Sequence, residues 1–197
     1  MKNAIVLTGG IATGKSTASA LMQLFGFRVI DADKIAHEVL DNSILEIEEA
    51  FGKEYIKDYK VDRKALGALV FADANKRAKL EAIVHPKIKD EILAKAKEQE
   101  KLGKPYLIDI PLFFEREGAY NIEKSIVVYA PLELQLKRLM QRDSLSKEEA
   151  MQRINAQLPI EVKKQKATFL IDNSKDLTHL QKECERVKEE ILRYAAS

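Results

Sequence analysis

Residues 9–16 of this 197-residue chain read Gly9-Gly10-Ile11-Ala12-Thr13-Gly14-Lys15-Ser16, which fits the pattern G-x-x-x-x-G-K-[ST] without a gap. Glycine lets consecutive backbone N–H groups curve around an anion, and a helix that begins near Lys15 points its positive end at the same place. Lys15 would reach the β- and γ-phosphates of a nucleotide, and the Ser16 hydroxyl would bind Mg²⁺. The stretch therefore predicts a phosphate-binding loop.

The segments on either side of this loop predict an α/β fold. Residues 4–8 form a short apolar run typical of a buried strand, and residues 15–25 carry apolar side chains at helical spacing. Further strands are expected at 27–30, 106–110, 125–129 and 168–171. Helices are expected at 132–142, 146–156 and 176–195, and in a long region at 34–101 that is interrupted near 52–61 and 73–75. Such alternation predicts one parallel sheet covered on both faces.

The composition excludes several classes of protein. Lys and Arg total 33 against 31 Asp and Glu, so the net charge is only +2, which argues against affinity gained mainly by neutralising a nucleic-acid backbone. A single cysteine, Cys184, cannot form an internal disulfide, and no apolar run approaches the roughly 20 residues that span a bilayer. We expect a cytoplasmic monomer or small homo-oligomer that binds neither nucleic acid nor a membrane.

Phosphate-binding loops serve several kinds of protein, and the rest of the chain favours a small-molecule kinase. The D-x-x-G and [NT]-K-x-D motifs of a GTPase are missing from the sequence. A motor ATPase would end a strand in an acidic pair, whereas Asp109 is followed by Ile110 and Pro111. A kinase lid needs cations late in the chain, and Arg138 and Arg142 supply them at a spacing of four residues on one helix face. The alternative for such arginines is a solvated charged face.

Two aspartates follow the strand expected at 27–30. If the chain is still extended there, Asp31 and Asp33 point to the same side, and one of them could accept the proton of a hydroxyl that attacks the γ-phosphate. The alternative is that such an aspartate caps the helix that begins at Lys34. His85 and Pro86 also allow two interpretations, a pocket or the first turn of a helix.

Over nearly its whole length, from Ile5 to about Asn173, the chain resembles the dephospho-coenzyme A kinase family of P-loop kinases. Besides the loop, the resemblance rests on Asp31-Ala32-Asp33, Leu80-Glu81 with His85-Pro86, Pro111-Leu112-Phe113-Phe114-Glu115, and Gln141-Arg142-Asp143. It implies a three-layer P-loop fold with a five-stranded parallel sheet in a single kinase domain. The core would comprise about 1–33, 104–141 and 167–197, with a helical substrate-binding insertion at about 34–103 and a helical lid at about 142–166.

The resemblance also implies an activity: phosphorylation of the ribose 3′-hydroxyl of dephospho-coenzyme A by ATP and Mg²⁺, the last step of coenzyme A synthesis. Asp33 would be the base, and Lys15 and Arg142 the other catalytic residues. The residues that would bind ATP are Gly10, Ala12, Thr13, Gly14, Lys15, Ser16, Thr17, Arg138 and Asn173, with Ser16 also binding Mg²⁺. Those that would bind the acceptor are Thr8, Asp33, Arg63, Arg77, His85, Pro86, Asp109, Leu112, Phe114, Glu115 and Lys163.

The sequence departs from the family pattern at Phe113, Gln165 and Thr168, none of which belongs to the predicted phosphate-binding loop. Two other functions stay open. One is a kinase for another small acceptor, such as a nucleotide or a sugar acid. The other is a nucleotide-dependent switch or binding module, which a preference for guanine nucleotides would indicate.

Overall fold

The structure, a computed structural model, describes residues 1–116, 118 and 120–196. The chain divides into two compact units, Met1–Ile30 with Ala96–Ser197, and Asp31–Lys95. In chain order the elements are β1 (Ala4–Gly9), α1 (Lys15–Leu24), β2 (Val29–Asp31), α2 (Ala32–Asp41), α3 (Ile44–Phe51), η1 (Lys53–Tyr55), β3 (Ile56–Lys57), β4 (Lys60–Val61), α4 (Arg63–Ala72), α5 (Ala74–Glu100), β5 (Tyr106–Asp109), η2 (Phe114–Arg116), β6 (Ser125–Tyr129), α6 (Leu132–Asp143), α7 (Lys147–Asn155), α8 (Ile160–Lys166), β7 (Phe169–Asp172) and α9 (Leu177–Ala196).

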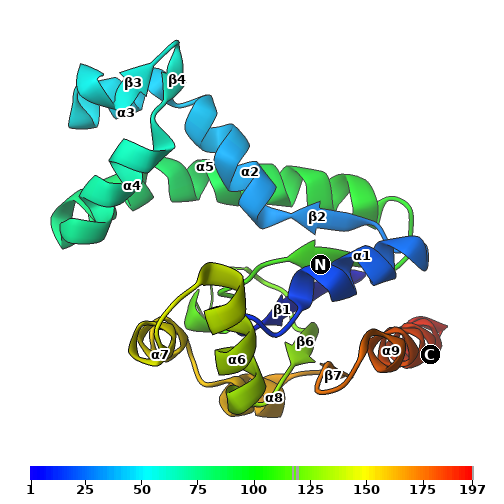
Figure 1. The fold of residues 1–197 in the computed structure, drawn as a ribbon. Coiled ribbons are helices and arrows are strands. Elements are labelled where there is room, and N and C mark those ends of the chain that lie inside the picture. The colour runs from blue at the N-terminus through cyan, green and yellow to red at the C-terminus, as the bar shows by residue number, and fades with distance from the viewer. Residues whose placement is uncertain (117, 119, 197) are drawn as a thin grey trace. The chain divides into compact units, whose positions relative to one another are not determined.

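A five-stranded sheet forms the centre of the first unit, in the order β2-β5-β1-β6-β7 (Figure 1). The pairs β1–β5, β1–β6 and β6–β7 are parallel, with Leu7 beside Asp109 and Gly9 beside Val128. All six residues of β1 are buried, which is why this strand is an almost continuous apolar run without polar alternation. The predicted α/β fold with a five-stranded parallel sheet is confirmed.

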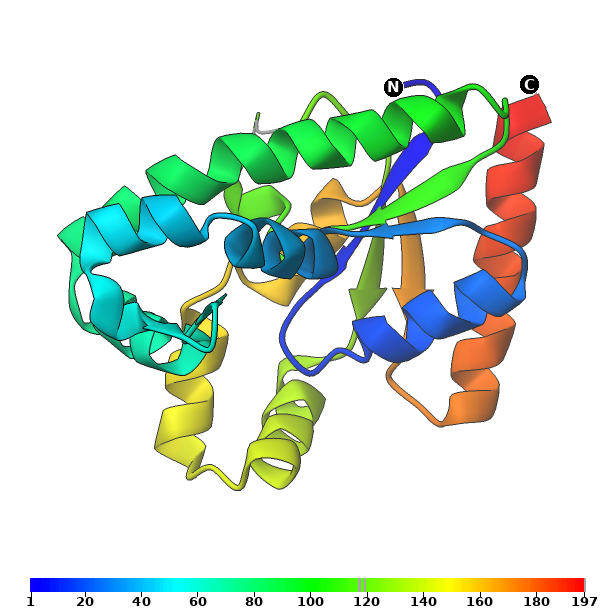
Figure 2. The same ribbon diagram turned by 90° about the horizontal axis from the view of Figure 1, so that it is seen from above.

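Helices α1 and α9 lie side by side against the sheet (Figure 2). Alternate residues of β1, Ile5 and Leu7, join one apolar cluster with Met22 of α1 and Val187 of α9. Cys184 of α9 is buried in the same cluster with no exposed surface, and this burial raises the pKa of its thiol to about 12. The cluster fixes the carboxyl end of β1 and the start of α1, and so positions the segment between them.

The second unit has a small core of its own. Ile47 and Phe51 of α3 pack with Leu66 of α4 and with Val61 of β4, the strand that pairs antiparallel with β3. Helix α5 continues without a break through Pro86, where the sequence favours a new helix start. Proline removes one backbone donor and costs stability in a helix interior, so neighbouring turns and packing must offset that loss. The expected limits of the insertion and of the lid stay predictions.

Candidate functional site

Residues 9–16, from the last residue of β1 to the second residue of α1, form what we call the phosphate loop. Its backbone requires glycine at two points. Gly14 has a φ of 87°, and a Cβ atom there would overlap Nδ2 of Asn173. A Cβ atom on Gly9 would lie 2.9 Å from the carbonyl oxygen of Val128. The loop therefore fits closely against the ends of β6 and β7, where no side chain could be inserted.

The side chains of Thr13 and Asn173 donate hydrogen bonds to carbonyl oxygens of the phosphate loop. The carbonyl oxygen of Gly10 accepts a hydrogen bond from Oγ1 of Thr13 at 2.9 Å, and the carbonyl oxygen of Thr13 accepts one from Nδ2 of Asn173 at 2.8 Å. Thr13 and Asn173 are both buried. In a trans peptide the N–H of the next residue points away from the carbonyl, so the bond to Asn173 directs the Gly14 N–H in the opposite direction.

A cavity of about 460 Å³ opens above the phosphate loop. Its lining residues are Gly9, Gly10, Ile11, Ala12, Gly14, Lys15, Ser16, Pro111, Arg138, Arg142 and Gln157. The first N–H groups of α1 have no acceptor within the helix, and the positive end of the helix dipole lies at the same point. Together with three cationic side chains, these features make the cavity suitable for a polyanion such as a nucleotide triphosphate.

Lys15 forms an ion pair with Asp109. Asp109 is the last residue of β5, directly beside β1, and both side chains are largely buried, with 20% of Lys15 and 10% of Asp109 exposed. In a parallel sheet the carboxyl ends of adjacent strands meet at the same edge, which is where ligands bind in α/β proteins. The pair thus places the ammonium group of Lys15 at the mouth of the phosphate loop.

Helix α6 brings two arginines to the cavity. Nη2 of Arg138 donates to the carbonyl oxygen of Asn173 at 3.1 Å, while its Nη1 is buried without a hydrogen-bond partner among the described residues. A buried donor of this kind is costly unless an acceptor arrives, and an anionic ligand in the cavity would be one. Arg142 forms a two-point ion pair with Asp143, at 2.7 and 3.0 Å, which lowers the pKa of that carboxyl. Arg153 of α7 donates to Asp143 as well, at 3.0 Å.

Two glutamines contact the phosphate loop, and neither is among the site residues predicted from the sequence. Oε1 of Gln157 accepts from the N–H of Ile11 at 2.9 Å. Gln135 is buried, and a Cβ atom added at Gly10 would lie 2.7 Å from its Oε1. The sequence held one signal for Gln135: it lies four residues before Leu139, on the buried face of α6.

Several residues predicted for the acceptor lie near the carboxyl end of β1. Thr8 is buried and donates through Oγ1 to the carbonyl oxygen of Pro111 at 3.0 Å. Lys163 forms an ion pair with Glu115 at 2.6 Å and donates to the carbonyl oxygen of Gly9 at 3.0 Å. The other two predicted residues of this stretch are Leu112, which is partly exposed, and Phe114, whose ring packs edge-on against Phe113.

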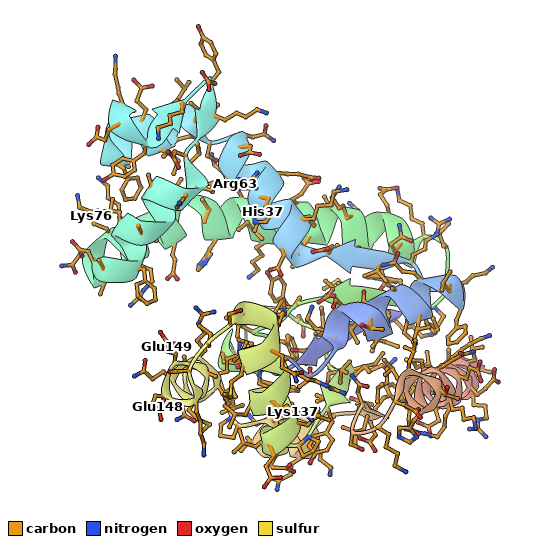
Figure 3. All side chains as sticks on the ribbon, in the orientation of Figure 1. His37, Arg63, Lys76, Lys137, Glu148 and Glu149 are labelled. Carbon is orange, nitrogen blue, oxygen red and sulfur yellow. The ribbon has the colours of Figure 1, made fainter. Side chains whose placement is uncertain are left out.

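The remaining predicted residues, Asp33, Arg63, Arg77, His85 and Pro86, belong to the second unit. Figure 3 labels Arg63 at the start of α4, where its Nε donates to Oδ1 of Asp41 at 3.3 Å. Arg77, His85 and Pro86 all lie on α5.

The chain passes from strand to helix between the two aspartates: Asp31 ends β2 with an extended backbone, and Asp33 lies in the first turn of α2. Helix α2 begins at Ala32, so Asp31 and Asp33 do not alternate as they would on a strand. Asp31 caps the helix, its Oδ1 accepting from the N–H of Lys34 at 2.9 Å, while Asp33 lies exposed in the first turn. The capping alternative is therefore correct for Asp31, whereas Asp33 is not the N-cap of α2.

The residues at the phosphate loop fit a Mg²⁺ ion that arrives with a nucleotide. Ser16 is exposed in the first turn of α1 and lines the cavity. Within the part of the chain that the structure describes, no group of three or more His, Cys, Asp or Glu could hold a metal ion without other ligands. A hydroxyl together with phosphate and water oxygens is a donor set that Mg²⁺ accepts.

A five-stranded parallel sheet with a phosphate loop after its central strand, and with arginines from a later helix facing that loop, defines a P-loop kinase. The family model for dephospho-CoA kinase matches residues 3–179. The chain belongs to the dephospho-CoA kinase family. It is accordingly an enzyme that uses ATP to phosphorylate dephospho-CoA in the biosynthesis of coenzyme A.

Individual members of the family are similar to this chain over nearly its whole length. The dephospho-CoA kinase of Sulfurimonas denitrificans is 53% identical over 190 residues, covering 96% of this chain and 94% of the relative. That of Helicobacter pylori is 44% identical over 194 residues, covering 98% and 99%. The solved structure of dephospho-CoA kinase from Campylobacter jejuni is 43% identical, with a TM-score of 0.79 over 97% of this chain and 98% of that one. Shikimate kinase from Acinetobacter baumannii, 18% identical with a TM-score of 0.56, shares the fold.

In residues 1–116, 118 and 120–196, no helix has both the length and the apolar composition needed to cross a membrane.

Proposed function

We propose that this chain transfers the γ-phosphoryl group of ATP to the ribose 3′-hydroxyl of dephospho-CoA, and that the nucleotide phosphates bind in the cavity above the phosphate loop. One observation carries the proposal: a single cavity collects the phosphate loop, the start of α1, Lys15, and both arginines of α6. Positive charge concentrated at one site is what a triphosphate and its transition state require.

Each group at the cavity has a proposed task. Backbone N–H groups of the phosphate loop and the start of α1 bind the β-phosphate, and Lys15 contacts the β- and γ-phosphates after exchanging part of its contact with Asp109. Nη1 of Arg138, which has no hydrogen-bond partner among the described residues, donates to the nucleotide. Mg²⁺ bound with ATP would be held by the Ser16 hydroxyl and would supply charge neutralisation at the phosphates.

The transfer itself is a displacement at phosphorus. The 3′-oxygen of the ribose forms a bond to the γ-phosphorus, and the bond from that phosphorus to the β–γ bridging oxygen breaks, leaving its electron pair on ADP. Asp33 accepts the proton that the hydroxyl loses. Arg142 stabilises the charge on the transferring group. Arg63, Arg77 and His85 of the second unit would bind the acceptor. The location of the protein in the cytoplasm, which we expect from the sequence, stays a prediction.

The test measures both products of the reaction. Purified protein is incubated with MgATP and, separately, dephospho-CoA, AMP, gluconate, shikimate or no acceptor, and ADP and coenzyme A are quantified by chromatography. We expect equal amounts of ADP and coenzyme A with dephospho-CoA, and background ADP otherwise. A phosphorylated product that is not coenzyme A, or stimulation by a different acceptor, would contradict the proposed acceptor while leaving the P-loop kinase intact.

A further inference from the structure

Lys163 is fully buried, and lysine is rarely found in the interior of a protein. It lies on α8 within a run of charged residues, yet it has no exposed surface, whereas its neighbour Lys164 is exposed. Burying an ammonium group is unfavourable unless charge and hydrogen bonds compensate it. The groups that surround Lys163 therefore bear on what it does.

Among the residues that the structure describes, two groups compensate this charge. Nζ lies 2.6 Å from Oε1 of Glu115 and donates to the carbonyl oxygen of Gly9 at 3.0 Å. The same oxygen of Glu115 accepts the N–H of Leu158 at 3.0 Å. Gln157, the residue before Leu158, accepts from Ile11 of the phosphate loop. Lys163 thus lies at the centre of a set of contacts that joins η2, the segment before α8, and the start of the phosphate loop.

The bond to Gly9 acts on the geometry of the loop at its first residue. Gly9 ends β1, and there is no room for a side chain between it, Val128 and Thr13. In a trans peptide the Gly9 carbonyl and the Gly10 N–H point in opposite directions, so a donor that fixes the carbonyl also fixes where the next N–H points. Lys163 does for the first peptide of the loop what Asn173 does for the peptide after Thr13.

We propose that Lys163 is a positioning residue for nucleotide binding: its ammonium group, anchored by Glu115, sets the orientation of the Gly9 peptide and thereby the shape of the phosphate loop. The inference rests on the proposed nucleotide site but not on the identity of the acceptor. Lys163 is not among the residues that line the cavity, whereas Gly9 is, so its action on bound phosphates passes through the loop.

The test compares Lys163→Met, which keeps the length and the apolar stem but removes the charge, with Lys164→Met on the same helix. The dissociation constant of a non-hydrolysable MgATP analogue is measured by calorimetry without any acceptor, followed by KM for each substrate. Loss of a charged hydrogen bond predicts an analogue Kd and a KM for ATP about tenfold higher or more. KM for dephospho-CoA should change less than about twofold, and Lys164→Met should match the wild type.

If Lys163 only stabilised the fold, Lys163→Met would change the analogue Kd no more than a core variant that destabilises the protein equally. Val187→Ala opens a cavity in the core beneath α9 and lowers the thermal midpoint without touching the loop, so it shows what destabilisation alone does to the analogue Kd. An unchanged analogue Kd in folded Lys163→Met overturns the proposal. So does a rise confined to KM for dephospho-CoA, which would instead make Lys163 a direct acceptor contact.

If Lys163→Met does not fold, Glu115→Gln carries the test. This variant leaves the ammonium group in place but removes its anionic anchor, so we expect the analogue Kd to rise about threefold or more. An unchanged Kd in folded Glu115→Gln overturns the proposal. Because the analogue is measured without an acceptor, a wrong assignment of dephospho-CoA would leave this result untouched.

Discussion

Nδ2 of Asn173 donates a hydrogen bond to the carbonyl oxygen of Thr13 across 2.8 Å, joining the end of β7 to the phosphate loop 160 residues earlier. The same amide group occupies the space that any side chain at position 14 would need. Residue 173 therefore fixes both the direction of one loop peptide and the requirement for glycine at Gly14. Nucleotide affinity should depend on it although it is buried.

Replacing Asn173 tests that dependence. Asn173→Ala removes the donor, and we expect the Kd of a MgATP analogue to rise about tenfold. Asn173→Asp should be worse, because a carboxylate has no donor for Thr13 and adds negative charge near the phosphates. Calorimetry measures both variants, with Ser174→Ala as the control because that hydroxyl donates to Asp172 and not to the loop. Wild-type affinity in Asn173→Ala would contradict this role.

Arg142 should matter for turnover more than for binding. Its side chain is exposed and paired with Asp143. From this position the guanidinium group can exchange the carboxylate of Asp143 for the transferring phosphoryl group when ATP binds. We expect Arg142→Ala to lower kcat by about 10³-fold, the scale of an arginine finger. Steady-state kinetics measures it, with Lys137→Ala on the same helix as the control (Figure 3). A loss of only a few-fold would assign Arg142 to a solvated charged face.

The two aspartates at the start of α2 form a matched pair for a test of the base. Asp33→Asn should leave the Kd of the MgATP analogue unchanged and abolish transfer, because an amide cannot accept the proton. Asp31→Asn should retain turnover within about threefold, because asparagine caps a helix as well as aspartate does. Coenzyme A formation measures both. Substantial transfer by Asp33→Asn would rule out Asp33 as the base.

The second unit should lose stability in acid in a way that Asp62 controls. The hydrogen bond from Lys57, together with the backbone N–H of Ala65, lowers the pKa of the Asp62 carboxyl. A lowered pKa in the folded state means that this stabilisation is full above the ordinary aspartate pKa and is lost as the pH falls below it. Asp62 also caps α4, so Asp62→Ala should melt a few degrees below the wild type at pH 7.

That difference should shrink steadily as the pH falls from 5 to 3, since protonation removes the same contacts in the wild type. Circular dichroism melts at each pH measure it, and Glu49→Ala, on the exposed face of α3, provides the control. A gap between Asp62→Ala and the wild type that stays constant down to pH 3 would show that the carboxylate charge contributes nothing.

The sheet and the phosphate loop could be predicted because their signals are local. A buried parallel strand must be apolar throughout, and a loop that surrounds phosphate needs glycines, a lysine and a hydroxyl at fixed spacing. The start of α2 could not, because moving a helix start by two residues changes Asp33 from a strand-end residue to one in a helical turn. Boundaries of this kind depend on competition between capping and strand pairing, which sequence patterns resolve poorly.

The resemblance names Arg138, Asn173 and Lys163 as site residues, but the sequence could not predict which groups they contact, because those contacts are long-range. Gln157 meets Ile11 from 146 residues away, and nothing in the pattern around either residue indicates the partner. Lys163 and Lys164 are the same residue type at adjacent positions, yet Lys163 is buried and Lys164 is exposed. Only the packing of α8 separates them.

Cys184 gives this chain an internal reporter of its own unfolding. Thiol reagents attack the thiolate, and the thiol of Cys184 has no exposed surface and a pKa of about 12. Labelling therefore requires α9 to leave the sheet. Since the sequence contains one cysteine, the rate at which a single label is incorporated measures how often that opening occurs, with no engineered probe.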